Sequence, residues 1–521
     1  MLLINNVKVP LELVDYRKII SQQLNISKNK IFDVKLVKQA VDARRKNKVH
    51  FVCSFNFTVE NEDLMIKKYP KLNLSKVVAY DYPVLKSTDE HIVVVGSGPA
   101  GLFCAYNLAR AHQKVTLIER GNAVEQRKED IDNFFKTGKL SPDSNVQFGE
   151  GGAGTFSDGK LTTGVKDKRK KFILETFVKH GAESDILYVN KPHVGTDYLI
   201  KVVKSMRETI IANGGEVLFE TKLVDVNLAD DQLVNIVVEK NNIKTTMELD
   251  KLVLAIGHSA RDTYEMLYQK GIKMEQKSFA VGLRIEHLQS FINEHQYGKY
   301  ANHPKAADYK LAVKTSNGRG VYTFCMCPGG KVINSSSEAG GIVVNGMSNQ
   351  ARDEANANSA VLVTVGPEDF ASSHPLAGIT YQRELEQKAF ELGGKDYSVP
   401  VMRVEDYLND TLDLKMEEVS CSVQPNVRYA KLSQIFSNEV NLALKEGLQL
   451  MNHKFTGFTE KAMLSGVESR SSAPVRLYRD ENFQSNIKGI MPIGEGAGYA
   501  GGIMSSAIDG LKCSEFILKG E

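Results

Sequence analysis

The sequence predicts an α/β protein whose largest domain is built on a parallel sheet. From residue 90 to the C-terminus, short apolar runs rich in β-branched residues alternate with helical patterns, as they do in parallel sheets. The first of these runs opens directly into a glycine-rich turn, which a helical pattern follows. One stretch breaks the alternation and predicts an antiparallel meander. Its short strands are expected at residues 216–220, 223–227, 234–239 and 245–249, before a buried strand at 251–256.

Composition narrows the class of protein further. The 521 residues are 42% hydrophobic, 25% charged and 8% aromatic, which excludes a disordered, collagen-like or disulfide-dense protein. A chain of this length suggests about three folding units. No apolar run is long enough to span a bilayer, and the first residues lack the pattern of a secretory signal. We therefore expect a cytoplasmic protein with no membrane partner.

The cysteines do not form a recognisable framework. No pair has the spacing C-x-x-C, and no group of Cys and His has the spacing of a zinc site. We expect no metal site, and thiols that are mostly reduced and buried. The six are Cys53, Cys104, Cys325, Cys327, Cys421 and Cys513.

Residues 1–85 predict a small basic α/β module. It carries 15 Lys and Arg against eight Asp and Glu, a net charge of +7, whereas the whole chain carries only +3. An amphipathic stretch joins its last two strands, and the polar segment 82–90, which contains a proline, predicts a linker to the next domain. Strands are expected at residues 2–9, 31–36 and 49–58, and a helix at 16–24.

The densest basic cluster of this module is Arg44, Arg45, Lys46 and Lys48. Charge clusters are usually solvated faces, and the alternative is a docking surface for nucleic acid or a partner protein. No aromatic RNP-type motif and no zinc finger accompanies the cluster. We therefore expect no nucleic-acid partner.

The strand at residues 92–95 begins a dinucleotide-binding pattern. Gly96 permits a tight turn, Gly98 lets the backbone approach a pyrophosphate, and Gly101 allows close packing of helix on strand. The N-terminus of the following helix offers free N–H groups to the phosphates. A second strand, at residues 114–118, ends in Glu119, which can accept hydrogen bonds from a ribose diol. An acid at this position suits FAD or NAD better than NADP.

Two further glycine-rich segments could contact a long ligand. Residues 490–510 read as a short strand, a glycine-rich turn with one acid, Glu495, and the start of a helix. Residues 149–160 form a glycine-rich loop with possible donors at Thr155, Ser157 and Lys160. The alternatives are an ordinary helix–helix turn for the first segment and a mobile surface loop for the second.

These segments together resemble a known family. The matching motifs are VVVGSGPAGLFCAYNLA, LIERG, QFGEGGAGTFSDGKL, LAIGHSARDT and PIGEGAGYAGGIMSSAIDG. They are similar to the single-Rossmann FAD flavoproteins related to p-hydroxybenzoate hydroxylase and fumarate reductase, and most of all to the bacterial FAD-dependent dehydrogenase family of unassigned substrate. The resemblance covers roughly residues 90–521.

The resemblance implies an FAD-binding Rossmann-like domain of the glutathione-reductase type, with the meander and with an inserted α+β substrate domain. The expected boundaries are 1–85 for the basic module, 90–270 and 461–521 for the two parts of the FAD-binding domain, and 271–460 for the substrate or cap domain.

The resemblance also implies where the cofactor lies. The first fingerprint holds the pyrophosphate, with Glu119 on the adenosine ribose and Arg120 beside the adenine or phosphates. Glu495 stands where related flavoproteins usually have aspartate, and is expected to reach the ribityl hydroxyls. The expected FAD contacts are Gly96, Ser97, Gly98, Pro99, Ala100, Gly101, Glu119, Arg120, Gly151, Gly152, Thr155, Ser157, Lys160, Gly257, Gly494, Glu495, Gly501, Gly502, Ile503 and Ser505.

The catalytic candidates are Cys325, Cys327 and His258. If residues 321–327 form a strand, both cysteines face one side with Cα atoms about 7 Å apart, the limit for a disulfide. The pair is then either a strained redox dithiol or two small residues beside a Pro-Gly-Gly turn. His258 could relay protons near neutral pH, or be structural, as could His193. Arg470 and Arg476 could bind a substrate or the flavin phosphates, or they could form ordinary ion pairs. Arg261, like His258, follows the buried strand that ends the meander.

We therefore expect an FAD-dependent oxidoreductase of the dehydrogenase type, which transfers a hydride between a small-molecule substrate and flavin N5. Only one complete strand–fingerprint–helix unit is found, so NAD(P)H is expected at most as a transient reductant. Two alternatives stay open: a flavin monooxygenase that uses NAD(P)H, and an RNA-directed flavoprotein with residues 1–85 as its docking module. A protein electron-transfer partner is also compatible with the sequence.

Overall fold

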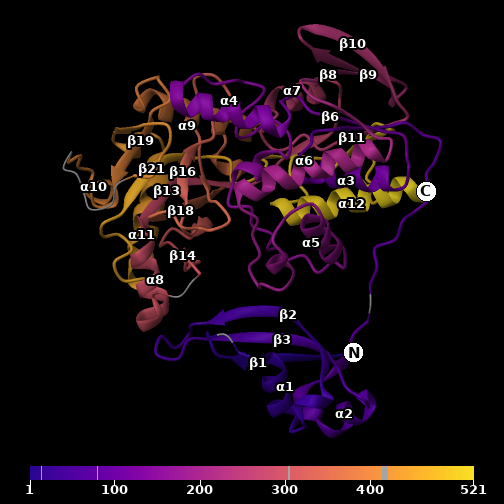
Figure 1. Ribbon diagram of the computed structural model, residues 1–521. Helices are drawn as coiled ribbons and strands as arrows, with labels where there is room; N and C mark the ends of the chain where they lie inside the picture. Colours follow the sequence, from indigo (N-terminus) through magenta and orange to yellow (C-terminus); the bar gives the residue numbers. More distant parts are fainter. Residues whose placement is uncertain (13, 79, 303–304, 414–420, 521) are drawn as a thin grey trace.

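The computed structural model describes residues 1–521 except 13, 79, 303–304, 414–420 and 521. Three units can be followed in Figure 1. We call them the N-terminal module (residues 1–85), the parallel-sheet domain (90–270 and 469–521) and the cap domain (271–468). In the described part of the chain, no helix is both long and apolar enough to cross a membrane.

The parallel-sheet domain is centred on a five-stranded sheet with the strand order β23-β11-β5-β6-β7 and only parallel neighbours. The central strand is buried on both faces: Ile92 and Val94 belong to one core, Val93 and Val95 to the other. This double burial explains its uninterrupted apolar sequence. The strands are β5 (Ile92–Val95), β6 (Val115–Ile118), β7 (Glu216–Leu218), β11 (Lys251–Leu254) and β23 (Ile490–Pro492).

Helices cover one face of this sheet (Figure 1). α3 (Pro99–Arg110) and α12 (Ile503–Lys519) pack against each other, with α5 (Arg169–Lys179) against α12 and α6 (Thr196–Ala212) against α3. A Cβ on Gly510 of α12 would lie 2.1 Å from the carbonyl oxygen of Ala100, so this glycine lets the two helices approach closely. Such a contact positions the N-termini of both helices at the cavity described below.

The opposite face is covered by the antiparallel meander and by α7 (Arg261–Gln269). The meander consists of β8 (Lys222–Ala229), β9 (Gln232–Lys240) and β10 (Ile243–Glu248). A strand does form within the expected residues 216–220, but its assignment to the meander was wrong. Residues 216–218 form β7, which pairs in parallel with β6, because the crossover helix α6 returns the chain to the edge of the main sheet.

The cap domain contains a seven-stranded mixed sheet with the order β14-β15-β18-β13-β21-β19-β20. Its last strand in sequence, β21, lies beyond the expected boundary at residue 460. The strands are β13 (Phe279–Leu288), β14 (Ala312–Lys314), β15 (Gly320–Cys327), β18 (Asn356–Val365), β19 (Val399–Arg403), β20 (Val427–Tyr429) and β21 (Met463–Glu468).

Two small ribbons and five helices complete these two domains. One ribbon pairs β16 (Lys331–Asn334) with β17 (Val344–Met347), and the other pairs β12 (Met274–Gln276) with β22 (Val475–Leu477), which joins the beginning of the cap to the returning chain. The helices are α4 (Val124–Thr137), α8 (Gln289–Tyr297), α9 (Ala377–Leu392), α10 (Val404–Asn409) and α11 (Asn438–Lys454).

The N-terminal module is an antiparallel sheet of order β2-β3-β1-β4 with two helices. The stretch expected to be amphipathic is divided. Its first part, up to Asp42, belongs to one long strand, β2, whose register shifts twice along its pairing with β3, and residues 43–48 belong to the connection to β3. Such bulges interrupt the alternation of a strand, so the pattern could not show its full length. The elements are β1 (Leu2–Val9), α1 (Tyr16–Leu24), β2 (Phe32–Asp42), β3 (His50–Thr58), α2 (Glu62–Lys68) and β4 (Ser75–Lys76).

Candidate functional site

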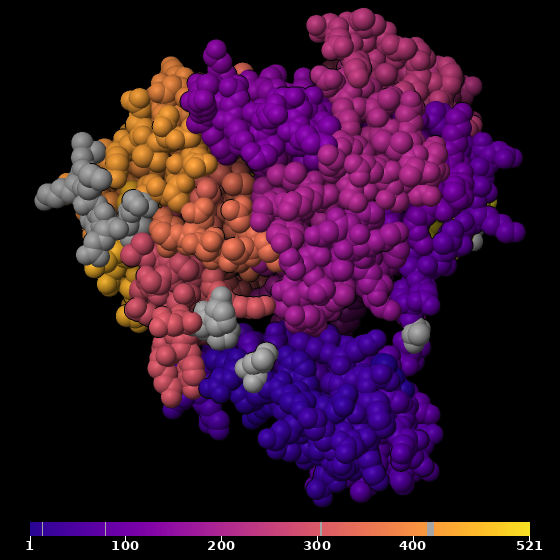
Figure 2. Space-filling view, viewed as in Figure 1, coloured from indigo at the N-terminus to yellow at the C-terminus, as the bar shows by residue number. Residues whose placement is uncertain are grey.

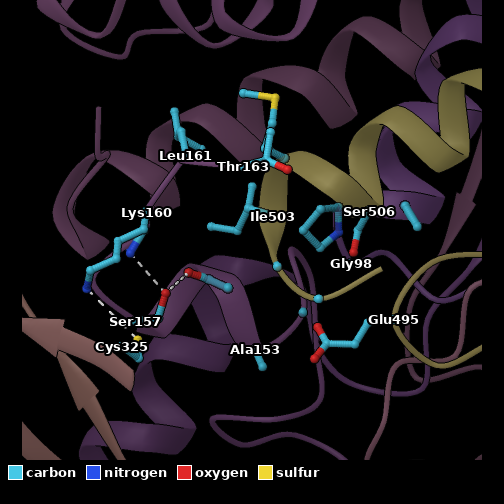
Figure 3. Close-up of a pocket in the computed structure, with 18 of the residues that line it drawn as sticks. Gly98, Ala153, Ser157, Lys160, Leu161, Thr163, Cys325, Glu495, Ile503 and Ser506 are labelled. Atoms are coloured by element: carbon cyan, nitrogen blue, oxygen red, sulfur yellow. Dashed lines mark hydrogen bonds between the residues drawn. The ribbon is translucent and has the colours of Figure 1, made fainter. Parts of the chain in front are cut away.

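A cavity of about 970 Å³ lies between the carboxyl end of the parallel sheet and the cap domain. This volume is at the upper end of the range for ligand pockets, as a long ligand requires. The cavity begins at Gly98 and Ala100 of α3, passes the N-terminus of α12, and reaches β15 of the cap at Cys325. Figure 3 shows Lys160 and Cys325 on one side of this cavity, with Ile503 and Glu495 farther along it.

The three fingerprint glycines have different structural reasons. Gly96 has φ +96°, and a Cβ there would lie 2.4 Å from the carbonyl oxygen of Ala255. A Cβ on Gly101 would lie 1.9 Å from the carbonyl oxygen of Gly96, so helix and turn pack too closely for a side chain. Gly98 is different, because its nearest neighbour would be the Cα of Gly152 at 3.9 Å. Gly96 and Gly101 therefore serve the fold, and Gly98 leaves room for a ligand.

Glu119 organises the loops around this turn. Its Oε2 accepts hydrogen bonds from the backbone N–H (2.9 Å) and the hydroxyl (2.8 Å) of Ser97, and its Oε1 accepts from the N–H groups of Gly121 and Gly149, both at 3.0 Å. A carboxylate has about four acceptor positions, so the protein itself uses them. The sequence suggested a ribose ligand for Glu119, whereas this geometry shows a carboxylate that joins the fingerprint to the glycine-rich loop.

The glycine-rich loop is held from behind by Arg127 of α4, a residue that sequence reasoning missed. The side chain is fully buried and donates to the carbonyl oxygens of Glu150 at 2.6 Å and Gly152 at 2.9 Å. Further hydrogen bonds reach the carbonyls of Asn145, Val146 and Gly149. Burial lowers the pKa of Arg127 to about 10, so it stays protonated at neutral pH. No motif marks such an arginine, because its partners are all backbone atoms.

Glu495 differs from Glu119 because its carboxyl group, which borders the cavity, has no hydrogen-bond partner among the described residues. Burial raises its pKa to about 7, against the opposing attraction of Lys277. A nearby α-helix N-terminus is formed by Gly502 and Ile503 of α12, where no side chain caps the helix. The carboxyl of Glu495 is therefore available to hydroxyl groups of a ligand that passes this helix.

A buried charge cluster lies where the cap meets the parallel-sheet domain. Glu386 accepts a bidentate pair of hydrogen bonds from Arg470, at 2.9 and 2.7 Å, and two more from Arg261, at 2.9 and 2.8 Å. Arg470, for which the sequence left ligand binding and ion pairing open, thus shares a buried carboxylate with Arg261 while it borders the cavity. Arg476 lies apart and pairs with Glu275 at 3.5 Å.

Two histidines that the sequence suggested as proton relays do not titrate near neutral pH. Burial, and then the charges of Arg470 and Arg261, lower the pKa of His258 to about 3. Burial, and then the charge of Arg352, lower the pKa of His193 to about 4. Both shifts favour the neutral ring, and a proton-relay role for either histidine stays a prediction.

Cys325 and Cys327 meet Lys160 at the cap side of the cavity. The Nζ of Lys160 lies 4.0 Å from the Sγ of Cys325, 3.8 Å from the Sγ of Cys327, and 2.7 Å from the fully buried carboxylate of Asp158. Asp158 also accepts from Arg352 at 2.5 Å, which fixes the ammonium group in place. Lys160, expected beside the flavin, therefore contacts the two thiols.

The expected cofactor residues divide into two groups. Those that border the cavity are Gly96, Gly98, Pro99, Ala100, Glu119, Arg120, Gly152, Ser157, Lys160, Gly257, Glu495, Gly501, Gly502 and Ile503. Those that do not are Ser97, Gly101, Gly151, Thr155, Gly494 and Ser505. The second group supports the first: the hydroxyl of Ser505 accepts from the N–H of Gly501 at 3.1 Å, and a Cβ on Gly151 would fall 2.0 Å from Oγ1 of Thr155.

These residues fit FAD. A Cβ on Gly257, Gly501 or Gly502 would meet no protein atom within 4 Å, so their backbones border open space. The helices α3 and α12 both begin at glycines, Gly98 and Gly502, that lie on the cavity and provide no side-chain cap. Uncapped helix N-termini bind anionic groups such as a pyrophosphate or a reduced flavin. Among the described residues, no group of His, Cys, Asp and Glu could hold a metal ion.

Val37 and Lys38 of the N-terminal module border the cavity. Figure 2 shows this module, in indigo, packed against the rest of the molecule. Gln39 of β2 donates to the carbonyl of Tyr188 at 2.7 Å and accepts from the N–H of Asn190 at 2.8 Å. Beyond Gln39, the side chains of Val41 and Ala43 pack against the core of the cap. Two residues of the basic cluster also have partners within this molecule. Lys46 packs against Gly298, and Arg44 forms an ion pair with Asp42 at 2.5 Å.

Comparisons with known proteins match three parts of the chain to protein families. Residues 278–471 match the family described as FAD-dependent protein, C-terminal domain-like, and residues 91–127 match FAD dependent oxidoreductase. Residues 1–58 match a domain of unknown function. A protein of Clostridium beijerinckii, described as uncharacterized, is 46% identical over 527 residues, which cover 99% of this chain and 98% of the relative.

Solved flavoproteins share the general arrangement at low similarity. A flavin-dependent brominase is 12% identical, with a TM-score of 0.38 and coverage of 83% of this chain and 79% of that one. The FAD complex of glycerol-3-phosphate dehydrogenase from Bacillus halodurans is also 12% identical, with a TM-score of 0.38 and coverage of 83% and 65%. At these scores the assignment rests on the family matches and on the clostridial relative. The chain belongs to the same family as that relative, a family of FAD-dependent oxidoreductases with a Rossmann-like fold, and its cofactor is FAD.

Proposed function

We propose that this oxidoreductase is a dehydrogenase, which transfers a hydride between a small organic substrate and N5 of the flavin. Bound FAD supplies the two-electron chemistry. The observation that carries the proposal is the single cavity that joins the uncapped ends of α3 and α12 to the inner wall of the cap. A substrate under the cap and a flavin at α12 would share this space.

The protein residues position and enclose the reactants. Arg470 is held toward the cavity by Glu386, and its Nη1 also donates to the hydroxyls of Ser337 at 2.7 Å and Ser259 at 3.0 Å. Residues of the cap and of the N-terminal module line part of the cavity. Exclusion of water from such a site strengthens the electrostatic interactions inside it. Burial lowers the pKa of His258, and, against the effect of burial, Asp158 raises the pKa of Lys160, so we assign proton transfer to the thiols or to the substrate itself.

The location and partners are also proposals. All six cysteines are free thiols, which supports a reducing compartment such as the cytoplasm. Part of the basic cluster of the N-terminal module packs on the cap, which favours a role within this molecule over RNA docking. A protein that accepts electrons from the flavin stays compatible with this arrangement.

Anaerobic spectroscopy with candidate reductants tests the proposal. We expect the flavin bands to persist with NADH or NADPH and to bleach with an oxidisable small substrate. Rapid oxidation of NAD(P)H that needs both oxygen and an aromatic substrate would instead identify a monooxygenase. Retention of RNA that is lost with rising salt would support the RNA-directed alternative.

A further inference from the structure

We propose that Cys325 and Cys327 form a redox-active dithiol that stores a second electron pair beside the flavin. This inference rests on the proposed flavin reaction and extends it, because it names where the electron pair goes after the flavin. The two cysteines, Lys160 and Arg284 are brought together by the end of β15, the glycine-rich loop and β13.

The backbone brings the two sulfurs together. Between Phe324 and Cys327 the register of β15 against β18 shifts, so the chain bulges at the first cysteine. Cys325 has φ +44°, a conformation that a residue with a side chain rarely adopts. The simple alternation expected for residues 321–327 is therefore absent. The Cys327 thiol donates to the carbonyl oxygen of Cys325 at 3.2 Å, and both sulfurs lie within 4.0 Å of the Nζ of Lys160. Strain of this kind is typical of functional sites.

The two thiols have different surroundings. Cys325 is partly exposed and borders the cavity, whereas Cys327 is fully buried behind it. Arg284 of β13 donates to the carbonyl oxygen of Cys325 at 2.7 Å and to the sulfur of Cys327 at 3.4 Å. Arg284 is itself buried and paired with Glu468 at 2.7 Å. One sulfur is thus placed to react with ligands, and the other to act as its partner.

The charges favour a thiolate on the exposed sulfur. The neighbouring Cys327 thiol, followed by the positive charges of Lys160 and Arg284, holds the pKa of Cys325 well below its usual value, despite burial and Asp158. The neighbouring Cys325 thiolate and burial raise the pKa of Cys327. A low-pKa thiolate beside a protonated partner is the usual form of a reactive dithiol.

The electron and proton balance follows from this asymmetry. When the pair is oxidised, its Sγ–Sγ bond takes up the electron pair of the anionic reduced flavin and breaks. The single proton released with that pair goes to Cys327, and Cys325 is left as the thiolate beside Lys160. The disulfide is reduced, the flavin is oxidised, and charge and protons balance without another reactant.

The other cysteines do not share these features. Burial raises the pKa of Cys421, and no cation is found beside its sulfur among the described residues. Because it is also partly exposed, Cys421 is a matched control for thiol chemistry. Cys104 and Cys513 also lie beside each other, but both are buried in the helical core and neither borders the cavity.

The test is an anaerobic count of electrons in the holoenzyme. The protein is oxidised with diamide, desalted and titrated with dithionite while the flavin spectrum is followed. We expect the wild type to take up two electron pairs per FAD, and Cys325→Ser and Cys327→Ser to take up one. Cys421→Ser should still take up two. Flavin absorbance of each variant shows that it is folded and loaded.

A second readout does not depend on the flavin. Trypsin releases residues 320–331, which contain both cysteines between Arg319 and Lys331. After oxidation and blocking of free thiols, this peptide should lack two hydrogens and carry no alkyl group. Two results would overturn the dithiol while leaving the flavin reaction intact. The first is a wild type that takes up one electron pair per FAD and gives an alkylated peptide. The second is an uptake of two electron pairs by both Ser variants. A protein that binds no flavin would contradict the proposed function instead, and the peptide mass would then decide the dithiol alone.

Discussion

The side chain of Arg127 lies directly against Gly149: a Cβ on that glycine would fall 2.4 Å from Cδ of the arginine, and the glycine carbonyl accepts a hydrogen bond from Nη1 at 3.2 Å. Gly149 therefore has no side chain because Arg127 occupies its place. The buried guanidinium holds the backbone that faces the ligand at Gly152.

Arg127→Met should destabilise the protein by about 3 kcal/mol or more, because several buried carbonyls lose a charged donor at once. The measurement is urea unfolding of apoprotein and holoenzyme. Lys128→Met is the matched control. Lys128 is the next residue of α4 and is exposed, so its loss should change the free energy of unfolding by less than about 0.5 kcal/mol. Equal effects of the two changes would contradict the role given to Arg127.

Gly98→Ala should weaken FAD binding, whereas Gly101→Ala should lower the stability of the protein. A methyl group on Gly98 meets no protein atom closer than 3.9 Å, so the apoprotein should unfold at the wild-type urea concentration while FAD binds at least about tenfold more weakly. A methyl group on Gly101 would overlap the carbonyl of Gly96 and should destabilise the apoprotein by about 1–3 kcal/mol. Unfolding curves and FAD titrations separate the two effects. Normal FAD affinity in Gly98→Ala would contradict the placement of the pyrophosphate.

Glu495→Gln should stabilise the apoprotein at alkaline pH. Burial raises the folded-state pKa of Glu495 to about 7 from an ordinary value of 4.5, so its charged form is disfavoured in the folded protein. The stability contributed by the protonated group is complete below pH 4.5 and is lost as pH rises through 7. Above pH 8 the variant should therefore be more stable than wild type by up to about 3 kcal/mol. Unfolding measured from pH 5 to 9 checks this, and a difference that is constant with pH would exclude it.

Lys160→Met should slow the alkylation of Cys325 by about tenfold at pH 7, because loss of the ammonium charge raises the pKa of the thiol. The groups that face this sulfur are Lys160, Arg284, Cys327 and, more remotely, Asp158. The rate of iodoacetamide labelling is measured against pH by mass spectrometry. Lys170→Met, which also removes a lysine that borders the cavity, is the control and should leave the profile unchanged. An unchanged profile in Lys160→Met would show that the lysine does not stabilise the thiolate.

The sequence was most informative where backbone geometry restricts residue type. The turn at Gly96 and the contact at Gly101 admit only glycine, so the fingerprint could be recognised without a structure. The apolar run of β5 likewise reflects burial on both faces. Side-chain partners were less predictable. Glu119 has the expected position but bonds to backbone and a serine of its own chain.

What the sequence could not show depends on contacts between distant segments. Arg127 binds carbonyl groups, which leave no trace in residue type. Arg284 meets Cys327 only because β13 and β15 flank β18 in the cap sheet. The lowered pKa of His258 follows from its burial and its arginine neighbours, which only the structure shows.

The visible absorption spectrum of the purified protein, before and after anaerobic addition of NADH or NADPH, tests the central claim most directly. We predict the bands of a bound oxidised flavin, either as purified or after incubation with FAD, and their persistence when the nicotinamide is added. Bleaching by NADH or NADPH would contradict the dehydrogenase proposal and indicate a nicotinamide-linked reductase or monooxygenase. Absence of flavin bands after incubation with FAD would contradict the whole account of the cavity.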